Sequence, residues 1–298
     1  ATVVVTDGAR TRDRVLEVVG DVQRTTLSGL TLRGGRRVAT FDQGGTLYWH
    51  AAIQGASLVI RDVVVTGGSG YYGGGASFAV PAEGSLDARG LVARGNTARA
   101  AGGGVSLLTG RSAIVAIVQS HLDRNRAYEA GGLELVGSAG DLGAARVLVS
   151  RSTFDGNHSS VAGGIELYSD AMPTTLADSR VHGNAADILG GGVLTRGSAA
   201  RIERSTIAGN AVGYDGGGVY AAAGSSTTIV NTTIAGNRSD RLGGGIYAQR
   251  QGHPETNVYL TNDTLAGNVA TTGGGIFADP GAAFTTLNTL IAHGRITG

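Results

Sequence analysis

The sequence predicts an all-β fold in which one chain winds as a parallel solenoid, and three observations predict it. A segment of the type Ser-Thr-Ile-Ala-Gly-Asn, found at 205–210, recurs along the chain, and its Asn returns every 26 to 32 residues. A run of glycines follows each Asn at a nearly constant distance. Aliphatic residues occupy fixed positions around both motifs and alternate with polar ones, a pattern typical of half-buried strands.

The repeated Asn is the clearest marker of the unit. Its seven occurrences are Asn96, Asn125, Asn157, Asn184, Asn210, Asn237 and Asn268. Because Asn tolerates left-handed backbone geometry, we expect it to form the turn between two strands of a coil. Stacked Asn side chains can bond to one another, whereas an unpaired buried amide would cost roughly 1–3 kcal/mol. The sequence therefore predicts a buried structural ladder of these seven residues.

Three aliphatic columns accompany this ladder. They lie eight residues before the Asn, three residues before it, and directly after the glycine run, as Ile202, Ile207 and Val219 do in one unit. Three short strands per repeat explain the columns if each strand pairs in parallel with its equivalent one turn on, about 4.8 Å away. The glycine runs suit a sharp corner where φ is positive or backbones approach closely.

The repeat extends over nearly all 298 residues, so we expect a single domain, 1–298. Within it we expect irregular turns over 1–55, regular turns over 56–284 and an incomplete last turn over 285–298. The net charge of +1 gives no indication of nucleic acid as a partner, and the sequence has no apolar run long enough for membrane insertion. The sequence has no cysteine, which excludes disulfides and cysteine metal sites.

The combination of Thr-Ile-Ala-Gly-Asn at 233–237 with Gly-Gly-Gly-Ile-Tyr at 243–247 resembles the right-handed β-helix repeat of bacterial surface and secreted proteins. These include the chlamydial polymorphic outer-membrane proteins and proteins with CSLREA-type repeats, whose opening turns the segment 27–32 also resembles. The resemblance implies a single-stranded right-handed parallel β-helix of about ten turns with pectate-lyase-like architecture. A cysteine-free solenoid rich in Thr, Ser and Gly and poor in charges is typical of an extracellular or cell-surface protein. We expect no cofactor other than a calcium ion at the acidic pair described below.

Pectate-lyase-like and polygalacturonase-like enzymes share this fold, but a fold alone does not define a function. The Asn-Thr-Asp, Asp-Asp, Gly-His-Gly and Arg-Ile-Lys elements typical of polygalacturonases are absent from the sequence. The sequence therefore offers no recognisable catalytic set, and we expect a protein that is not an enzyme.

Two glutamates form the best acidic constellation. Glu134 and Glu166 each lie two residues after the last glycine of their runs, so we expect them on adjacent strands, pointing outward and about 5 Å apart. Two close carboxylates favour a shared proton or a cation such as calcium, and such pairs also serve as acid and base. Asp123 and Asp155 form a second adjacent pair. The alternative is two solvated ladders, partly neutralised by neighbouring arginines.

The same outward column continues as Tyr220, Tyr247 and Phe277. We expect an exposed aromatic ladder, which is a candidate contact surface for sugars or a partner protein. The alternative is that a neighbouring loop covers these rings, or that they stabilise the sheet by stacking across strands.

These observations predict a secreted or cell-surface protein with a structural or adhesive role. The first turn begins directly in a strand and the last turn stops without a cap, so we also expect head-to-tail assembly of copies into filaments. The alternative is that these residues are a fragment whose capping turns lie outside the 298 residues. The alternative function is a polysaccharide-active enzyme or a carbohydrate-binding module that uses an outward face of the solenoid.

Overall fold

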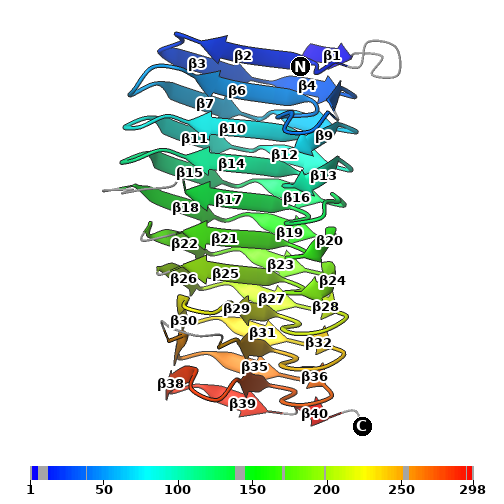
Figure 1. Ribbon diagram of the computed structural model, residues 1–298, viewed down its shortest axis with the longest axis vertical. Coiled ribbons are helices and arrows are strands. Elements are labelled where there is room, and N and C mark those ends of the chain that lie inside the picture. The colour runs from blue at the N-terminus through cyan, green and yellow to red at the C-terminus, as the bar shows by residue number, and fades with distance from the viewer. Residues whose placement is uncertain are drawn as a thin grey trace.

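The computed structural model describes residues 2–5, 13–37, 39–137, 145–169, 172–197, 199–250, 255–292 and 294–296. All regular structure in these ranges is β, in 40 short strands that stack along one long axis (Figure 1). Within the same ranges, no helix is long and apolar enough to cross a membrane. The strands pair in parallel throughout, as the constant spacing of the repeats predicts.

Three parallel sheets form the walls of a right-handed solenoid. Sheets B and C each have ten strands and sheet A has eleven, and each coil visits B, C and A in that order. Ten stacked strands are separated by about nine steps, so the solenoid has about nine turns where we expected about ten. The predicted fold class is thereby confirmed.

The strands are short, and their bounds are as follows. Sheet A contains β1 (Thr2–Val5), β4 (Leu30–Arg33), β8 (Val64–Thr66), β12 (Val92–Arg94), β16 (His121–Asp123), β19 (Thr153–Asp155), β23 (Arg180–His182), β27 (Thr206–Ala208), β31 (Thr233–Ala235), β35 (Thr264–Ala266) and β39 (Leu290–Ala292). Sheet B contains β2 (Leu16–Gly20), β6 (Leu47–Ala51), β10 (Ala76–Val80), β14 (Val105–Thr109), β17 (Leu133–Gly137), β21 (Ile165–Ser169), β25 (Val193–Gly197), β29 (Val219–Ala221), β33 (Ile246–Ala248) and β37 (Ile276–Ala278). Sheet C contains β3 (Arg24–Ser28), β7 (Ser57–Arg61), β11 (Ser85–Arg89), β15 (Ile114–Val118), β18 (Arg146–Ser150), β22 (Thr174–Ala177), β26 (Ala200–Glu203), β30 (Ser226–Val230), β34 (Asn257–Thr261) and β38 (Ala283–Leu287).

A corner segment leads from each sheet A strand back to sheet B and carries short strands of its own. These are β5 (Arg36–Arg37), β9 (Ser69–Tyr72) and β13 (Thr97–Ala101) in one stack, and β20 (His158–Val161), β24 (Ala185–Leu189), β28 (Ala211–Val212), β32 (Arg238–Ser239), β36 (Val269–Ala270) and β40 (Arg295–Ile296) in another. Isolated parallel bridges connect the two stacks through Arg126 and Glu129. The corner segments therefore form a continuous wall along the solenoid.

In the segment 1–55, where we expected irregular turns, the described strands already follow the regular stacking. β2 pairs with β6 over five residues, and β3 pairs with β7 over five residues. In this region the buried Trp49 indole donates a hydrogen bond to Thr25 Oγ1 at 2.9 Å. The apolar interior begins here and continues through the stacked aliphatic columns of all three sheets.

The seven repeat Asn residues form an unbroken ladder inside the solenoid. Each is at most 1% exposed. From Asn96 to Asn237, both the backbone N–H and the side-chain amide donate to Oδ1 of the next Asn, at 2.9–3.0 Å. The amide also donates to a backbone carbonyl of the preceding coil, as Asn210 Nδ2 does to Val181 O. Each amide is thus satisfied only by neighbouring turns.

The expectation that the Asn itself adopts left-handed geometry is wrong. Positive φ belongs to the residue before it, which is a glycine in six of the seven repeats and Arg124 in the other. At Gly209, for example, φ is 63°. The left-handed residue turns the chain, and this turn directs the following Asn side chain inward, where it can reach its neighbours.

The glycine runs leave room for this ladder. A Cβ atom built on Gly192 would lie 2.6 Å from Gly218 O and 2.9 Å from Asn210 Nδ2. The equivalent third glycines, from Gly75 to Gly245, meet the next glycine carbonyl and the next Asn in the same way. The Asn ladder can therefore form only where glycine occupies the position that faces it.

A second polar ladder, which the sequence analysis did not identify, lies at the corner between sheets C and A. Ser120 N–H donates to Ser152 Oγ at 3.1 Å, and the pattern continues through Ser179, Ser205 and Thr232 to the carboxylate of Asp263. The available signal was a Ser, Thr or Asp five residues before the Asn in these six repeats. Both corners thus use buried side-chain acceptors to satisfy backbone N–H groups.

Candidate functional site

The outer face of sheet B carries a column of residues in register that differs in character along the axis. We call these ten positions the outer column: Glu17, Tyr48, Ser77, Ser106, Glu134, Glu166, Leu194, Tyr220, Tyr247 and Phe277. The first six are polar and the last four are apolar or aromatic. The corner wall lies beside this column, so its contacts decide which positions solvent can reach.

In the apolar half, the corner wall covers the column completely enough to form a second, small core. Val161, Leu189 and Leu242 from the wall pack against Leu194, Tyr220 and Tyr247. The first glycine of each run brings the wall close, since a Cβ atom on Gly243 would lie 2.7 Å from Tyr247 Cβ. The wall therefore shields this half from solvent.

The predicted exposed aromatic contact surface is wrong for this reason. Tyr220 and Tyr247 are 2% and 5% exposed, and Phe277 is half-buried. The rings of Tyr220 and Tyr247 are 5.1 Å apart, and those of Tyr247 and Phe277 are 5.8 Å apart and stacked. The Tyr247 hydroxyl donates to Asp279 Oδ2 at 2.9 Å. The rings are thus packing residues, as the alternative interpretation proposed.

Glu134 and Glu166 lie directly opposite each other on β17 and β21, as the spacing predicted. The interpretation as solvated ladders is wrong, because these two residues are only 8% and 4% exposed. Glu134 Oε2 accepts a hydrogen bond from Ser106 Oγ at 2.6 Å. Glu166 Oε1 lies 3.2 Å from Arg196 Nε, while its Oε2 is buried without a hydrogen-bond partner.

Burial raises the pKa of both glutamates to about 7. For Glu134, the hydrogen bond from Ser106 opposes this rise in pKa, and the negative charge of Glu129 adds to it. For Glu166, Arg196 lowers the pKa, whereas Glu129 and Glu134 raise it. The two side chains therefore titrate near neutral pH as a pair, and Arg196 supplies a positive charge to Glu166 alone among the described residues.

Asp123 and Asp155 are also in register, but each has its own basic side chain as a partner. Asp123 is buried and bonded to Arg94 and Arg124, whereas Asp155 is half-buried and its carboxylate lies 2.9 Å from His182 Nδ1. Among the residues that the structure describes, no three His, Cys, Asp or Glu side chains are grouped so that they could hold a metal ion.

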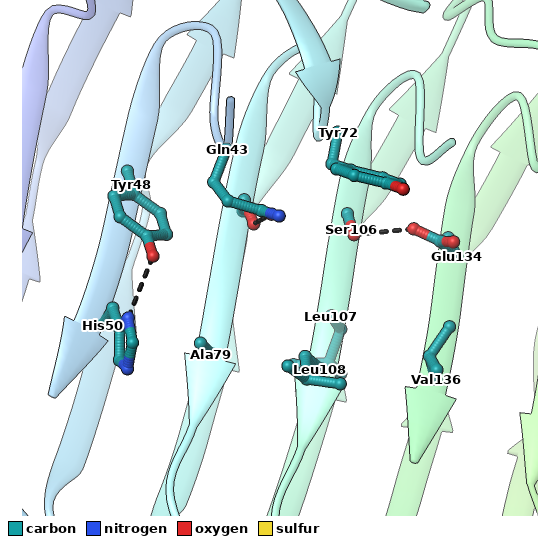
Figure 2. A pocket seen from close by; sticks show the side chains of 11 residues that line it. Gln43, Tyr48, His50, Tyr72, Ala79, Ser106, Leu107, Leu108, Glu134 and Val136 are labelled. Atoms are coloured by element: carbon teal, nitrogen blue, oxygen red, sulfur yellow. Dashed lines mark hydrogen bonds between the residues drawn. The ribbon is translucent and has the colours of Figure 1, made fainter. Parts of the chain in front are cut away.

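A groove of about 500 Å³ lies over the polar half of the outer column. We call it the sheet B groove. Figure 2 shows its lining, which combines two tyrosine rings with hydrogen-bonding groups and a few aliphatic side chains. The residues that line it are Gln43, Tyr48, His50, Tyr72, Ser77, Ala79, Ser106, Leu107, Leu108, Glu134 and Val136.

Internal hydrogen bonds fix the polar groups of this groove. Tyr48 Oη and His50 Nδ1 are 3.0 Å apart, and Ser77 Oγ donates to Gln43 Oε1 at 2.8 Å. The Arg14 guanidinium lies over the Tyr48 ring, 4.8 Å from its centroid. Burial raises the pKa of the Tyr72 hydroxyl, and Tyr71, Glu134 and Glu129 raise it further. The groove thus presents hydrogen-bonding groups whose positions are fixed by their neighbours.

The glycine spacing places Glu134 on an outward face but gives no indication of the groove around it. Tyr48 occupies the outer column of an early turn whose repeat motif is weak, so the register that groups it with Glu134 was not evident. Gln43 and Tyr72 come from corner segments, whose lengths vary between repeats. The signal available in the sequence was the pair Tyr71-Tyr72 directly before a glycine run.

This fold and its repeats define a β-helix protein, and a comparison with known families agrees. The family model described as a right-handed β-helix region matches residues 142–294, which is about half of the chain. The chain therefore belongs to this family. A search of curated proteins finds no matching relative.

Proposed function

We propose that the protein is a secreted or cell-surface structural protein with an adhesive role, and that it binds a neutral glycan chain in the sheet B groove. The observation that carries the proposal is the groove itself, which places two tyrosine rings and several fixed hydrogen-bonding groups on one open face. Concave sites of this size and mixed lining are typical of ligand binding.

The chemistry of the lining favours a sugar. The apolar faces of sugar rings pack on aromatic rings such as Tyr48 and Tyr72, which are both partly exposed. Sugar hydroxyls donate and accept, and the amide of Gln43 and the carboxyl group of Glu134 offer matching partners. Above about pH 7, where the Glu134 carboxyl group with its raised pKa is ionised, its negative charge repels an anionic polymer.

Affinity electrophoresis tests this proposal directly. Hydroxyethylcellulose supplies a neutral, flat glycan, dextran a neutral chain of different shape, and polygalacturonate an anionic chain. We expect hydroxyethylcellulose to retard the protein and polygalacturonate not to do so. Tyr72→Ala should abolish much of the retardation, whereas Tyr259→Ala, on the outer face of sheet C, should not change it. No retardation by any of the three polymers would contradict the proposal.

A polysaccharide-active enzyme is the second candidate function. It is favoured by two adjacent carboxyl groups with a pKa of about 7, one of which faces the groove. In retaining glycosidases the two carboxyl groups are roughly 5 Å apart. Release of reducing ends from hydroxyethylcellulose that Glu134→Gln abolishes would favour the enzyme. Binding without release, in both the wild type and Glu134→Gln, would favour the adhesive role.

The extracellular location is supported by the family, whose members are common among secreted and surface proteins. The motifs at 233–237 and 243–247 add the resemblance to chlamydial polymorphic outer-membrane proteins and CSLREA-type repeats. Protease accessibility on intact cells that express the native protein tests this location. Protection of the chain until the cells are lysed would contradict it.

Head-to-tail assembly is a separate part of the proposal. Leu287, Leu290 and Ile291 on β38 and β39 are 57%, 59% and 47% exposed. Another layer of parallel strands from a second copy would cover them and pair their backbone groups. Sedimentation over a range of concentrations should then show growing species that Leu290→Glu suppresses. A monomer at every concentration would contradict assembly.

A further inference from the structure

Phe41 is an exposed aromatic residue in a backbone conformation that suits it poorly. Its side chain is 71% exposed, which is the largest value among the exposed large hydrophobic residues of the described chain. Its φ is 70°, in the left-handed region that bulky side chains rarely adopt. The ring contributes little buried surface to the fold, and its left-handed backbone conformation is unfavourable. Stability of the fold therefore does not explain why an aromatic residue is present here.

Backbone hydrogen bonds hold this strained residue in place. Asp42 N–H donates to Ala39 O at 3.1 Å and closes a turn around Phe41. The turn is then bound to the corner wall, because Tyr72 N–H donates to Asp42 O at 3.0 Å and Gly44 N–H donates to Tyr72 O at 2.8 Å. The ring is therefore presented from an anchored segment.

The ring of Phe41 continues the aromatic surface of the groove beyond its rim. The ring centroids of Phe41 and Tyr71 are 5.7 Å apart, and those of Tyr71 and Tyr72 are 4.9 Å apart. Tyr72 lines the sheet B groove, and Phe41 and Tyr71 do not belong to its lining. The three rings thus form a series that leads from outside the groove to its interior.

We propose that Phe41 and Tyr71 form an outer stacking subsite, so that the ligand of the groove is an extended neutral glycan chain rather than a single sugar. This inference rests on the proposed glycan binding and specifies its substrate class. A chain that fills the groove can place a further sugar ring on Phe41 only if it continues past Tyr72. Affinity should therefore increase with chain length, and the increase should depend on Phe41.

Isothermal titration with cellobiose and cellohexaose tests this dependence. Phe41→Asn is the informative variant, because Asn tolerates the left-handed backbone and lacks the ring. We expect the variant to bind cellohexaose roughly two- to tenfold more weakly, as the loss of one aromatic contact implies. Binding of the short cellobiose, which fits inside the groove, should not change. Tyr259→Ala, an exposed aromatic residue of sheet C, serves as the matched control.

Thermal unfolding of the same variant provides an independent readout. If the Phe41 ring serves binding and its left-handed backbone is strained, replacing it should not destabilise the fold. We therefore expect Phe41→Asn to unfold at the same temperature as the wild type or at a higher one. A clear decrease in Tm would overturn the inference, because Phe41 would then serve the fold.

The outcomes separate this inference from the proposed function. If neither oligosaccharide binds the wild type, glycan binding of this kind is wrong, and the outer subsite is wrong with it. If cellohexaose binds but Phe41→Asn binds it equally well, the groove binds glycan and the outer subsite alone is rejected. Equal weakening for cellobiose and cellohexaose would also reject it, because Phe41 would then contact the sugar inside the groove.

Discussion

The two halves of the outer column share one backbone position and differ in what the corner wall does over them. From Leu194 to Phe277, apolar wall residues meet aromatic rings, and the interface closes into a second core. From Tyr48 to Glu134, polar residues and the tyrosines of an early corner leave a groove of about 500 Å³. The difference teaches that a regular solenoid leaves an open groove where the repeat stops being apolar on its outer face.

The buried glutamates stand at the boundary between these halves. Glu134 faces the groove, whereas Glu166 on the next strand is buried beside the partly exposed Arg196. The fold keeps two acidic groups at a place where burial raises their pKa. Such a cost is common at functional sites, which agrees with a role for the polar half in binding.

Removing an aromatic ring should distinguish the two halves most clearly. Tyr220→Ala leaves a cavity in the closed half, and we expect the free energy of unfolding to decrease by about 3 kcal/mol. Tyr72→Ala in the open half should lower the free energy of unfolding by at most about 1 kcal/mol, and it should weaken glycan binding instead. Chemical denaturation of both variants measures this contrast. Equal destabilisation would show that the wall packs both halves alike.

The Asn ladder passes through both halves, and substitution of a ladder residue should destabilise the fold in either half. Asn210→Leu removes the acceptor of two donors on Asn184, and it leaves the backbone N–H of residue 210 as the remaining donor of this position to Asn237 Oδ1. We expect a loss of roughly 2–3 kcal/mol in the free energy of unfolding. Asn268→Leu, at the last position of the ladder, should cost less because it has fewer partners. A Tm of Asn210→Leu equal to that of the wild type would mean that the ladder does not stabilise the fold.

The boundary glutamates should make stability depend on pH. Their pKa rises from 4.5 to about 7 on folding, so the folded state favours the protonated form. Stability should therefore be greatest below about pH 4.5 with respect to these groups, and it should decrease as the pH rises to 7. Glu134→Gln should increase the free energy of unfolding by up to about 3 kcal/mol at pH 8 and change it little at pH 4. A variant that is destabilised equally at both pH values would contradict this assignment.

Calcium is expected to have the smallest effect. If Glu134 and Glu166 bind it, 10 mM calcium should raise Tm by an amount equivalent to roughly 1 kcal/mol for a millimolar site, and a chelator should reverse the shift. Glu166→Gln should remove the response. A Tm that calcium leaves unchanged would instead favour the shared proton as the means by which this pair is kept in the fold.

The sequence by itself determined the solenoid, because the residues of each repeat contact mainly the equivalent residues of the adjacent turns. Ile202, Ile207 and Val219 define three strands by local alternation. From Asn96 to Asn268 the Asn and glycine positions make the same contacts with the adjacent turns in each repeat. The identity of these residues was therefore sufficient to predict the sheets, the register and the buried ladder.

Only the tertiary structure decided which outward residues meet solvent. An alternating strand shows that Glu134, Glu166 and Tyr220 point away from the main core, but whether they are exposed depends on the corner segment that lies over them. That segment varies in length and sequence from coil to coil, and its path is set by long-range pairing with other corners. The groove, the second core and the raised pKa of the glutamates all depend on that pairing, which local sequence patterns do not predict.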